Sequence, residues 1–501
     1  MALSQSFACG LVVIFAIQWS CFAAKFAMIS MKGRSHYMVL ERLGKELESR
    51  GHEVVIFVGE CEKYALKDSN IRTFECSEEI NKLVDPTAIA GLKVVWYHYC
   101  DAMLGHHNNM NEAKTADLII GDAMYLCSFL VADKFSLPHV TVLMSPLSTA
   151  LRLPYNFADL PSYIPQMFSG LTDDMNFLQR AGNSLRWFLG RLSSPNALHS
   201  VYGGLKEKYN ITPEKTLQQT FQKVDIVLVQ SDPLDYPRPH LPNTKLVGPL
   251  LSSPAESLAE ELEQFVRGSG DKGVILVSFG SILGEISDQT ISTMADVFST
   301  LPQRVIWKLN TDGKKLTLGE NIKALSWLPQ NDILGHPKTR LFIGHAGMNG
   351  LLQAGYHGVP MICVPFFGDQ FDNSIAAKYF GMAEILYQES ITTESLLNTI
   401  NTVINNASYR ESAARISKSI KLRPRTSIQE SADWVEYTLA QGGLPHLRPK
   451  SLDLPFYKLY LLDVLFVFVV LLIVVFVAVY SVIRCFCRLC FKSNPNKAKS
   501  H

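Results

Sequence analysis

The fold is decided by residues 327–370, which read WLPQNDILGHPKTRLFIGHAGMNGLLQAGYHGVPMICVPFFGDQ. The apolar run 341–343 predicts a buried strand, and the glycine-rich stretch after it predicts a tight turn into a helix. A second apolar run, at 360–365, predicts the next strand. A strand, a helix and a second strand in this order are typical of a βαβ unit in a parallel sheet.

The same alternation of apolar runs and helical patterns continues on both sides of this segment. One series of expected strands lies at 26–30, 54–58, 118–120 and 139–143, and a second lies at 273–278, 304–308, 340–343, 360–365 and 384–387. We therefore expect an α/β fold with two facing Rossmann-like domains, each built on a doubly wound parallel sheet. Ligands of such sheets lie at the carboxyl ends of the strands, so we expect the site in the cleft between the domains.

The length and charge of the chain agree with this organisation. A chain of 501 residues suits two globular domains, which we assign to residues 24–246 and 273–445. The linker between them, 247–272, is expected to contain a short polar helix. Because 47 Lys and Arg stand against 46 Asp and Glu, the basic excess typical of a nucleic-acid binder is absent from the composition.

Both ends of the chain carry membrane signals. Residues 1–23 are typical of a signal peptide cleaved after Ala23, with a retained anchor or a buried first strand as the alternatives. Residues 464–483 carry no charge and are long enough to cross the ~30 Å core of a bilayer as a helix. Residues 446–463 are then a juxtamembrane segment.

The basic tail 484–501 contains no acidic residue, so the positive-inside rule predicts a single-pass, type I topology with this tail in the cytosol. The remainder is then lumenal. Lys497 and Lys499 resemble a dilysine retrieval signal, which predicts the endoplasmic reticulum membrane. The sequons at Asn210 and Asn406 are candidate glycosylation sites, and Pro213 makes the first the poorer acceptor.

The cysteines do not form the pattern of a disulfide scaffold. Five of the 10 lie in the two membrane-associated ends, and the others are Cys61, Cys76, Cys100, Cys127 and Cys363. One or two bridges are compatible with a lumenal compartment, but the fold must depend on its core.

Residues 150–192 combine proline and aromatic residues with few charges. Two interpretations stay open and do not exclude one another. In the first, the segment is a helical insertion packed on the first sheet. In the second, it forms a wall of an apolar acceptor pocket and touches a membrane surface.

The turn after the strand at 341–343 has the properties of an anion site. Gly344, Ala346 and Gly347 open a helix whose first N–H groups are unpaired, and His345 and Asn349 add side-chain donors. A diphosphate fits such a site without a P-loop lysine. Ser281 ends a second strand-to-helix turn that is expected to face the same space.

At this point the sequence resembles the UDP-glycosyltransferase family, in particular its animal, membrane-anchored branch that includes the UDP-glucuronosyltransferases. The resemblance extends over nearly the whole chain and is most specific between Trp327 and Gln370. It implies the GT-B arrangement of two facing Rossmann-like domains, with the acceptor in the N-terminal domain and the UDP-sugar in the C-terminal one.

The resemblance also implies roles for individual residues. Trp327 matches the residue that stacks on uracil, and Gln330 matches one that reaches the nucleoside. The expected donor-binding set is Ser281, Trp327, Gln330, His345, Gly347, Asn349, Gln353, Asp369 and Gln370. In this set, His345, Asn349 and Ser281 match phosphate contacts, while Asp369 and Gln370 match the pair that bonds the sugar hydroxyls. No metal and no cofactor are expected, because UDP-sugar is a co-substrate.

Three positions depart from the family pattern. The family usually has Ser or Thr at Gly344, Gly at Ala346 and Glu at Gln353. The Glu accepts hydrogen bonds from both ribose hydroxyls, and Gln353 loses the charge-assisted part, worth about 1–2 kcal/mol. These changes are expected to weaken the donor site without abolishing it.

The acceptor side carries the expected catalytic pair, His36 and Asp122. His36 follows the first strand, where a lone histidine is more often structural, but the resemblance implies that it is the general base. The helix start beside it is expected to keep the imidazole neutral. Asp122 ends another strand and matches the carboxylate that orients the histidine, whereas Asp117 begins that strand and should face the opposite end.

With the resemblance, these residues imply an inverting transfer of a glucuronosyl or glucosyl group to a hydroxyl of a small lipophilic acceptor. The alternatives are a catalytically weak relative that binds UDP-sugar or a lipophile, and a transferase with a narrow lipid or sterol acceptor. Lys323 and Arg340 are candidate partners for a glucuronate carboxylate. The expected partners are the two substrates and the bilayer, with no nucleic acid, and a homo-oligomer is one open alternative.

Overall fold

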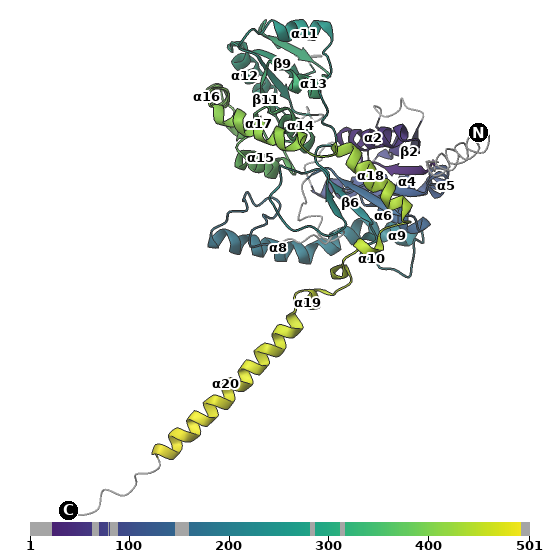
Figure 1. Ribbon diagram of the computed structural model, residues 1–501, viewed down its shortest axis with the longest axis vertical. Helices are drawn as coiled ribbons and strands as arrows, with labels where there is room; N and C mark the ends of the chain where they lie inside the picture. The colour runs from purple at the N-terminus through teal and green to yellow at the C-terminus, as the bar shows by residue number, and fades with distance from the viewer. Residues whose placement is uncertain are drawn as a thin grey trace, which may run out of the picture. The chain divides into compact units, whose positions relative to one another are not determined.

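The computed structural model describes residues 23–62, 70–78, 80, 89–145, 160–280, 286–310 and 316–491 (Figure 1). Residues 1–22 of the expected signal peptide, Ser281 and the end of the basic tail lie outside these residues. The chain divides into two compact units, Met1–Leu447 and Arg448–His501.

The first unit begins with a parallel sheet of seven strands in the order β3-β2-β1-β4-β5-β6-β7. The strands are β1 (Lys25–Ile29), β2 (Glu53–Gly59), β3 (Ile71–Phe74), β4 (Leu118–Asp122), β5 (His139–Leu143), β6 (Ile226–Val229) and β7 (Thr244–Leu246). The order changes direction between β1 and β4, and ligands of doubly wound sheets bind at this point.

The helices of this part are α2 (Arg34–Ser49), α4 (Ile89–Gly105), α5 (His107–Lys114), α6 (Cys127–Phe135), α8 (Phe177–Leu198), α9 (Gly204–Lys208) and α10 (Leu217–Phe221), with a π-helical turn η2 (His199–Gly203). Both faces of the sheet are covered. Phe26 and Met28 of β1 lie in one apolar cluster, and Ala27 and Ile29 lie in the other. A strand buried on both faces has no polar alternation, which explains the continuous apolar runs in the sequence.

The second sheet has six parallel strands in the order β10-β9-β8-β11-β12-β13. They are β8 (Val274–Ser278), β9 (Arg304–Lys308), β10 (Ile322–Leu325), β11 (Thr339–Gly344), β12 (Met361–Cys363) and β13 (Ala383–Ile385). Its direction changes between β8 and β11. The predicted segment 341–365 therefore lies at the centre of this sheet, and the α/β class with two parallel sheets is confirmed.

Helices follow the strands of the second sheet as the sequence predicts. They are α11 (Glu260–Arg267) in the expected linker, α12 (Asp288–Ser299), α13 (Gln330–Gly335), α14 (Met348–His357), α15 (Gln370–Tyr379), α16 (Thr393–Asn405), α17 (Ala407–Lys421) and α18 (Ser427–Ala440). Short 3₁₀ turns lie at η4 (Gln388–Ser390) and η5 (Pro445–Leu447).

The last of these helices, α18, packs against the first sheet (Figure 1). Its Ala432 and Val435 are buried in the same cluster as β1 and α2. Arg50 at the end of α2 forms ion pairs of 2.8 Å with Asp433 and 2.9 Å with Glu436. The expected C-terminal domain, 273–445, included this helix, because helical periodicity does not indicate which of two sheets a helix covers.

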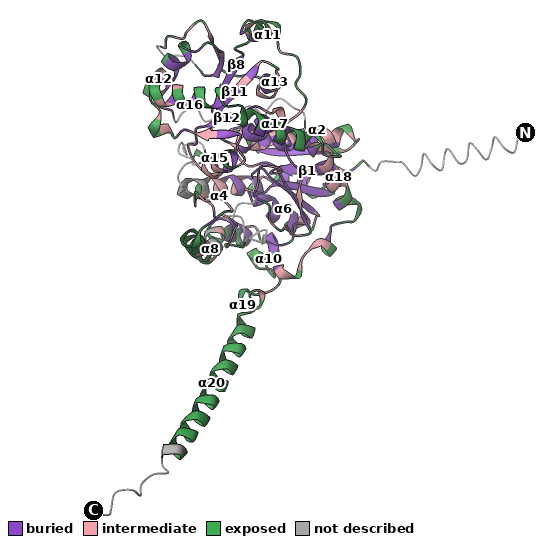
Figure 2. Ribbon diagram, turned by 60° about the vertical axis from the view of Figure 1, so that its left-hand side comes forward, coloured by how far each residue is buried: buried purple, intermediate pink, exposed green. Residues whose placement is uncertain are grey.

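The second unit contains η6 (Lys450–Leu452), α19 (Phe456–Leu459) and the long helix α20 (Leu462–Phe491). An 18-residue window within Leu462–Leu489 of α20 has a mean hydropathy of 3.3, and none of this window is buried (Figure 2). By length and composition this is one candidate membrane span, and it contains the predicted segment 464–483.

Two disulfides join cysteines of the first sheet region. Cys61 is bonded to Cys76, and Cys100 to Cys127. Cys363 is free and buried in β12. The sequence predicted one or two disulfides, and the structure has two among the described residues.

Candidate functional site

His36 and Asp122 meet at the point where the first sheet changes direction. α2 begins after Gly33, whose φ of +135° is a conformation that glycine adopts readily, and His36 lies in its first turn. The Nδ1 atom of His36 is 2.5 Å from Oδ2 of Asp122. Asp122 is the last residue of β4, is fully buried, and accepts a second hydrogen bond of 2.8 Å from the Met124 N–H. Its carboxylate is therefore held by the backbone while it contacts the imidazole.

This contact corrects one expectation about His36. Burial lowers the pKa of His36, but the charge and hydrogen bond of Asp122 and the charge of Asp369 outweigh burial and raise that pKa above 6.5. The helix start was expected to keep the ring neutral. Two carboxylates favour the imidazolium more strongly than burial opposes it, so His36 is a stronger base than a free histidine.

Asp369 and Gln370 lie at the start of α15, close enough to His36 for Asp369 to shift its pKa. Burial raises the pKa of Asp369, whereas the Asn373 amide, 3.0 Å away, and His36 oppose the rise. The Oε1 atom of Gln370 accepts from the Phe366 and Phe367 N–H groups at 2.9 and 3.3 Å. These bonds leave the amide N–H groups of Gln370 as donors for a ligand.

Trp327 is half exposed, with 49% of its surface accessible, as a stacking platform requires. One face is already covered, because the guanidinium carbon of Arg34 lies 3.5 Å from the ring centroid. The Nζ atom of Lys308 lies 4.9 Å from the same centroid and donates to the Gly280 carbonyl at 2.6 Å. Neither cation could be identified from the sequence, because their approach to Trp327 joins segments distant in the chain.

His345 lies directly after β11, between two glycines. A Cβ atom at Gly347 would lie 2.4 Å from the His345 Nε2 atom, and one at Gly280 would lie 2.8 Å from Cε1. Burial lowers the pKa of His345 to about 4. The Ser278 backbone opposes this decrease, and the charge of Lys308 adds to it. The ring is therefore neutral near pH 7, and it can act on a diphosphate as a hydrogen-bond donor but not as a cation.

Asn349, in the first turn of α14, joins the two halves of the unit. Its Oδ1 accepts from Nε2 of Gln230 at 2.7 Å, and its Nδ2 donates to the Ser35 carbonyl at 3.3 Å. Gln230 follows β6 and is fully buried. The predicted phosphate ligand thus also contacts the backbone next to His36, and Gln230 is a residue that sequence reasoning did not identify.

Gln330 and Gln353 bond to each other. The Nε2 of Gln330 donates to Oε1 of Gln353 at 2.8 Å, and Nε2 of Gln353 donates to the Leu251 carbonyl at 3.3 Å. The carbonyl oxygen that was expected to accept from ribose therefore already accepts from Gln330.

The other two departures have local consequences. Ala346 has a φ of +59°, a conformation that costs an L-residue about 1–2 kcal/mol, and its buried methyl group returns about 0.8 kcal/mol. A Cβ at Gly344 would lie 2.8 Å from Cζ of Phe342, so a larger residue there requires that ring to move.

The two candidate cations for a glucuronate carboxylate lie elsewhere. Lys323 forms an ion pair of 2.5 Å with Glu261, and Arg340 donates to the Pro337 carbonyl near the amino end of β11. The site lies at the carboxyl ends of the strands, whereas Lys323 and Arg340 lie at the amino ends of β10 and β11, away from the site. Arg34 and Lys308 are the cations at Trp327.

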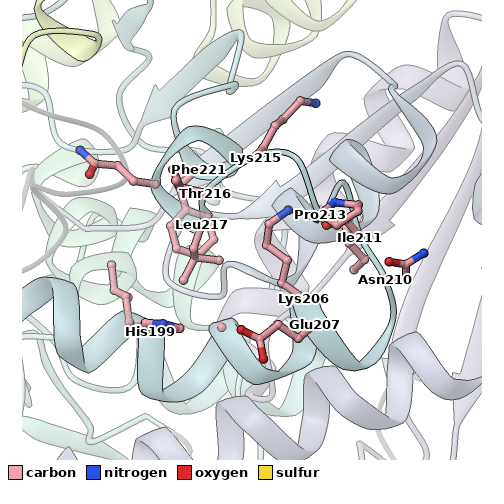
Figure 3. Close-up of a pocket in the computed structure, with 13 residues that line it drawn as sticks. His199, Lys206, Glu207, Asn210, Ile211, Pro213, Lys215, Thr216, Leu217 and Phe221 are labelled. Carbon is pink, nitrogen blue, oxygen red and sulfur yellow. Dashed lines mark hydrogen bonds between the residues drawn. The ribbon is translucent and has the colours of Figure 1, made fainter.

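The first unit contains a small hollow beside Asp369 and a larger cavity elsewhere. A hollow of about 70 Å³ is lined by Asp369, Asp372 and Tyr236, and burial raises the pKa of Asp372 to about 6. A larger cavity of about 600 Å³ lies between η2, α9 and α10 (Figure 3). Its lining includes Asn210, a predicted glycosylation site, but none of the predicted catalytic or donor-binding residues.

The two sequon asparagines are both exposed. Asn406 caps α17 by accepting from the Ser408 N–H at 3.1 Å. Asn210 has a φ of +45°, and the hydroxyl of Thr212 in its sequon is bonded to Asp133. Their glycosylation stays a prediction. Within the described ranges, no group of three or more His, Cys, Asp or Glu residues is arranged to hold a metal.

Comparison with known families gives one match that covers most of the chain. The family model described as UDP-glucoronosyl and UDP-glucosyl transferase matches residues 62–499. The UDP-glucuronosyltransferase 3A1 of Bos taurus is 33% identical over 473 residues, which cover 88% of this chain and 89% of that protein. The 2-hydroxyacylsphingosine 1-beta-galactosyltransferase of Homo sapiens is 31% identical, covering 90% of this chain and 87% of that protein.

Solved structures show the same fold at lower identity. The calicheamicin glycosyltransferase CalG4 has a TM-score of 0.60 at 19% identity, covering 84% of this chain and 99% of that one. A UDP-glucose:anthocyanidin 3-O-glucosyltransferase in complex with UDP has a TM-score of 0.58 at 18% identity, covering 83% and 99%. The GT-B arrangement is therefore confirmed.

Proposed function

Since the chain belongs to the UDP-glucoronosyl and UDP-glucosyl transferase family and is a UDP-glycosyltransferase, we propose that it transfers a glucuronosyl or glucosyl group to a hydroxyl of a small lipophilic acceptor. The observation that carries the proposal is the 2.5 Å contact between His36 and the buried Asp122, with Asp369 close by. A base, its orienting carboxylate and a sugar-binding carboxylate then lie around one point.

In the proposed reaction, Nε2 of His36 accepts the proton of the acceptor hydroxyl. The hydroxyl oxygen attacks the anomeric carbon while the bond to the UDP oxygen breaks. Asp122 holds Nδ1 and stabilises the imidazolium that forms. One displacement inverts the anomeric configuration, so an α-linked UDP-sugar gives a β-glycoside.

On the donor side, we propose that uracil stacks on Trp327 and that the diphosphate lies at the start of α14. His345, neutral and held between glycines, donates one hydrogen bond there, and Lys308 supplies positive charge. Asp369 and Gln370 bind the sugar hydroxyls. Gln330 reaches the nucleoside, and Gln353 supports it through their mutual hydrogen bond.

The experiment that tests this proposal measures UDP release by the full-length chain in detergent micelles. A panel of UDP-sugars is combined with phenolic and sterol acceptors, and His36→Ala is the control. Acceptor-dependent release with one sugar, reduced about 10²–10⁴-fold in His36→Ala, is the expected result. UDP binding without release by either protein would instead favour the weak-relative alternative.

We further propose the endoplasmic reticulum and a lumenal orientation for the first unit. The apolar helix Leu462–Leu489 and the basic tail that follows support a single-pass, type I arrangement. A glycan on Asn406 that endoglycosidase H removes is the expected finding in intact cells. Protection of the tail, rather than the first unit, from protease in sealed microsomes would contradict this orientation.

A further inference from the structure

Helix α8 leaves nearly all of its surface uncovered. Among its described side chains, only Asn183 is buried, although the helix has 22 residues. Six large apolar side chains are between 46% and 77% exposed: Phe177, Leu178, Leu185, Phe188, Leu189 and Leu192. Figure 2 shows this helix as a mostly exposed element at the surface of the first unit. A surface helix normally turns such residues toward the core.

The helix is nevertheless firmly held, through Asn183. Its Nδ2 donates to the Pro161 and Ile164 carbonyls at 2.8 and 2.9 Å, and its Oδ1 accepts from the Gln166 N–H at 2.8 Å. Three hydrogen bonds to the preceding segment therefore fix which face of α8 points toward the protein.

The exposed apolar residues form the opposite face. At about 100° per residue, all six lie within about 60° of the direction opposite Asn183. We name this set of six residues the apolar stripe. Because Asn183 points inward, the stripe points away from the protein.

The charges of α8 are all positive. Arg180, Arg186 and Arg191 lie on the two flanks between Asn183 and the apolar stripe, and the helix contains no acidic residue. A helix with an apolar face and arginine flanks is typical of segments that lie in the plane of a bilayer surface, with the apolar face buried at the acyl-chain boundary.

We propose that the apolar stripe of α8 inserts into the surface of the bilayer to which α20 anchors the chain. The anchor keeps lipid near the first unit, so a site too weak to bind alone is occupied as an intramolecular contact. A second copy of the chain fits less well, because a symmetric pair of α8 helices would bring six arginines together. The proposal is independent of the proposed chemistry.

The test uses the full chain in vesicles of brominated phosphatidylcholine with one fifth phosphatidylserine. The tail cysteines Cys485 and Cys487, which are exposed, and Cys490 are replaced by serine, and Leu185→Cys carries an environment-sensitive fluorophore. Leu422→Cys is the matched control, since Leu422 is also a strongly exposed leucine of the first unit but lies outside α8.

The expected result is a blue shift and quenching by brominated lipid at position 185, with neither effect at 422. Absence of quenching at 185, or equal quenching at both positions, would overturn the proposal. A blue shift at 185 that depends on protein concentration and not on lipid would also overturn it, in favour of a second copy. Both substitutions are at exposed sites, and circular dichroism of each labelled protein verifies its fold.

Discussion

At the residue scale, the pKa of His36 makes a prediction about pH. Asp122 and Asp369 raise this pKa above 6.5 against the effect of burial, so His36 loses its proton only above that value. The acid limb of kcat/KM should therefore lie above pH 6.5. Asp122→Asn removes the closest negative charge while burial persists, so the limb should move to lower pH and turnover should fall. Initial rates between about pH 5 and about pH 9 measure both effects.

Asp117, at the amino end of β4, is the matched control for Asp122, which lies at the carboxyl end of this strand. Asp117 precedes β4 and accepts from the Lys25 N–H at 2.8 Å, away from His36. Asp117→Asn should leave the acid limb where it is in the parent protein. If the limb stays in place in Asp122→Asn as well, Asp122 does not set the basicity of His36.

The contact between Arg34 and Trp327 makes a second prediction at this scale. A base that stacks on the face of Trp327 covered by Arg34 must displace this guanidinium, whose carbon lies 3.5 Å from the ring centroid. An exposed cation–π contact is worth about 0.5–1 kcal/mol, so Arg34→Ala should lower the donor KM about two- to fivefold. Donor titrations at saturating acceptor measure it. A KM that rises instead would mean that Arg34 binds the donor, and Trp327→Ala in parallel establishes that the platform is used.

The sequence could locate residues whose position depends on one strand and one turn. His36, Asp122 and His345 each follow a predicted strand, so their place at the carboxyl edge follows from the pattern alone. Arg34, Lys308 and Gln230 could not be found, since their contacts cross between segments far apart in the chain. Lys323 and Arg340 were misplaced for the same reason.

At the scale of elements, α18 makes a prediction about stability. Val435 is buried against the first sheet although it follows the second sheet in sequence. Val435→Ala should cost about 2 kcal/mol of unfolding free energy and loosen β1 and β4, but not β8 and β11. Hydrogen exchange of the strand amides, measured by mass spectrometry, resolves the two sheets.

Val403→Ala is the matched control, because Val403 of α16 is equally buried but lies in a cluster with β8 and β9. Faster exchange in β8 for Val435→Ala would contradict the assignment of α18.

The elements themselves were predictable to different degrees. Strands with long apolar runs, such as β1, β8 and β11, were found because both of their faces are buried. β3, β6, β7 and β10 were missed; they have three or four residues and three of them lie at sheet edges, but β12 and β13 are as short and were predicted, so length alone does not explain the difference. The partner of α18 was unpredictable because its pattern fits either sheet.

At the scale of the whole molecule, Asn349 connects chemistry with the joining of the two sheets. It bonds to Gln230, beside the first sheet, and to the Ser35 carbonyl next to His36, while it lies in the first turn of α14, a helix of the second sheet. A residue that only binds phosphate would not affect the stability of the protein without UDP. Because Gln230 is fully buried, Asn349→Ala leaves its amide N–H unsatisfied, which costs about 1–3 kcal/mol.

We therefore expect Asn349→Ala to lower the midpoint of thermal unfolding before any donor is added, as measured by calorimetry on the full chain in micelles. Asn398→Ala on the exposed face of α16 is the control and should cause no such drop. An unchanged midpoint for Asn349→Ala together with weaker UDP binding would assign Asn349 to the donor alone. A lower midpoint with weaker UDP binding would mean that the residue that binds the diphosphate also holds the acceptor side in register with it.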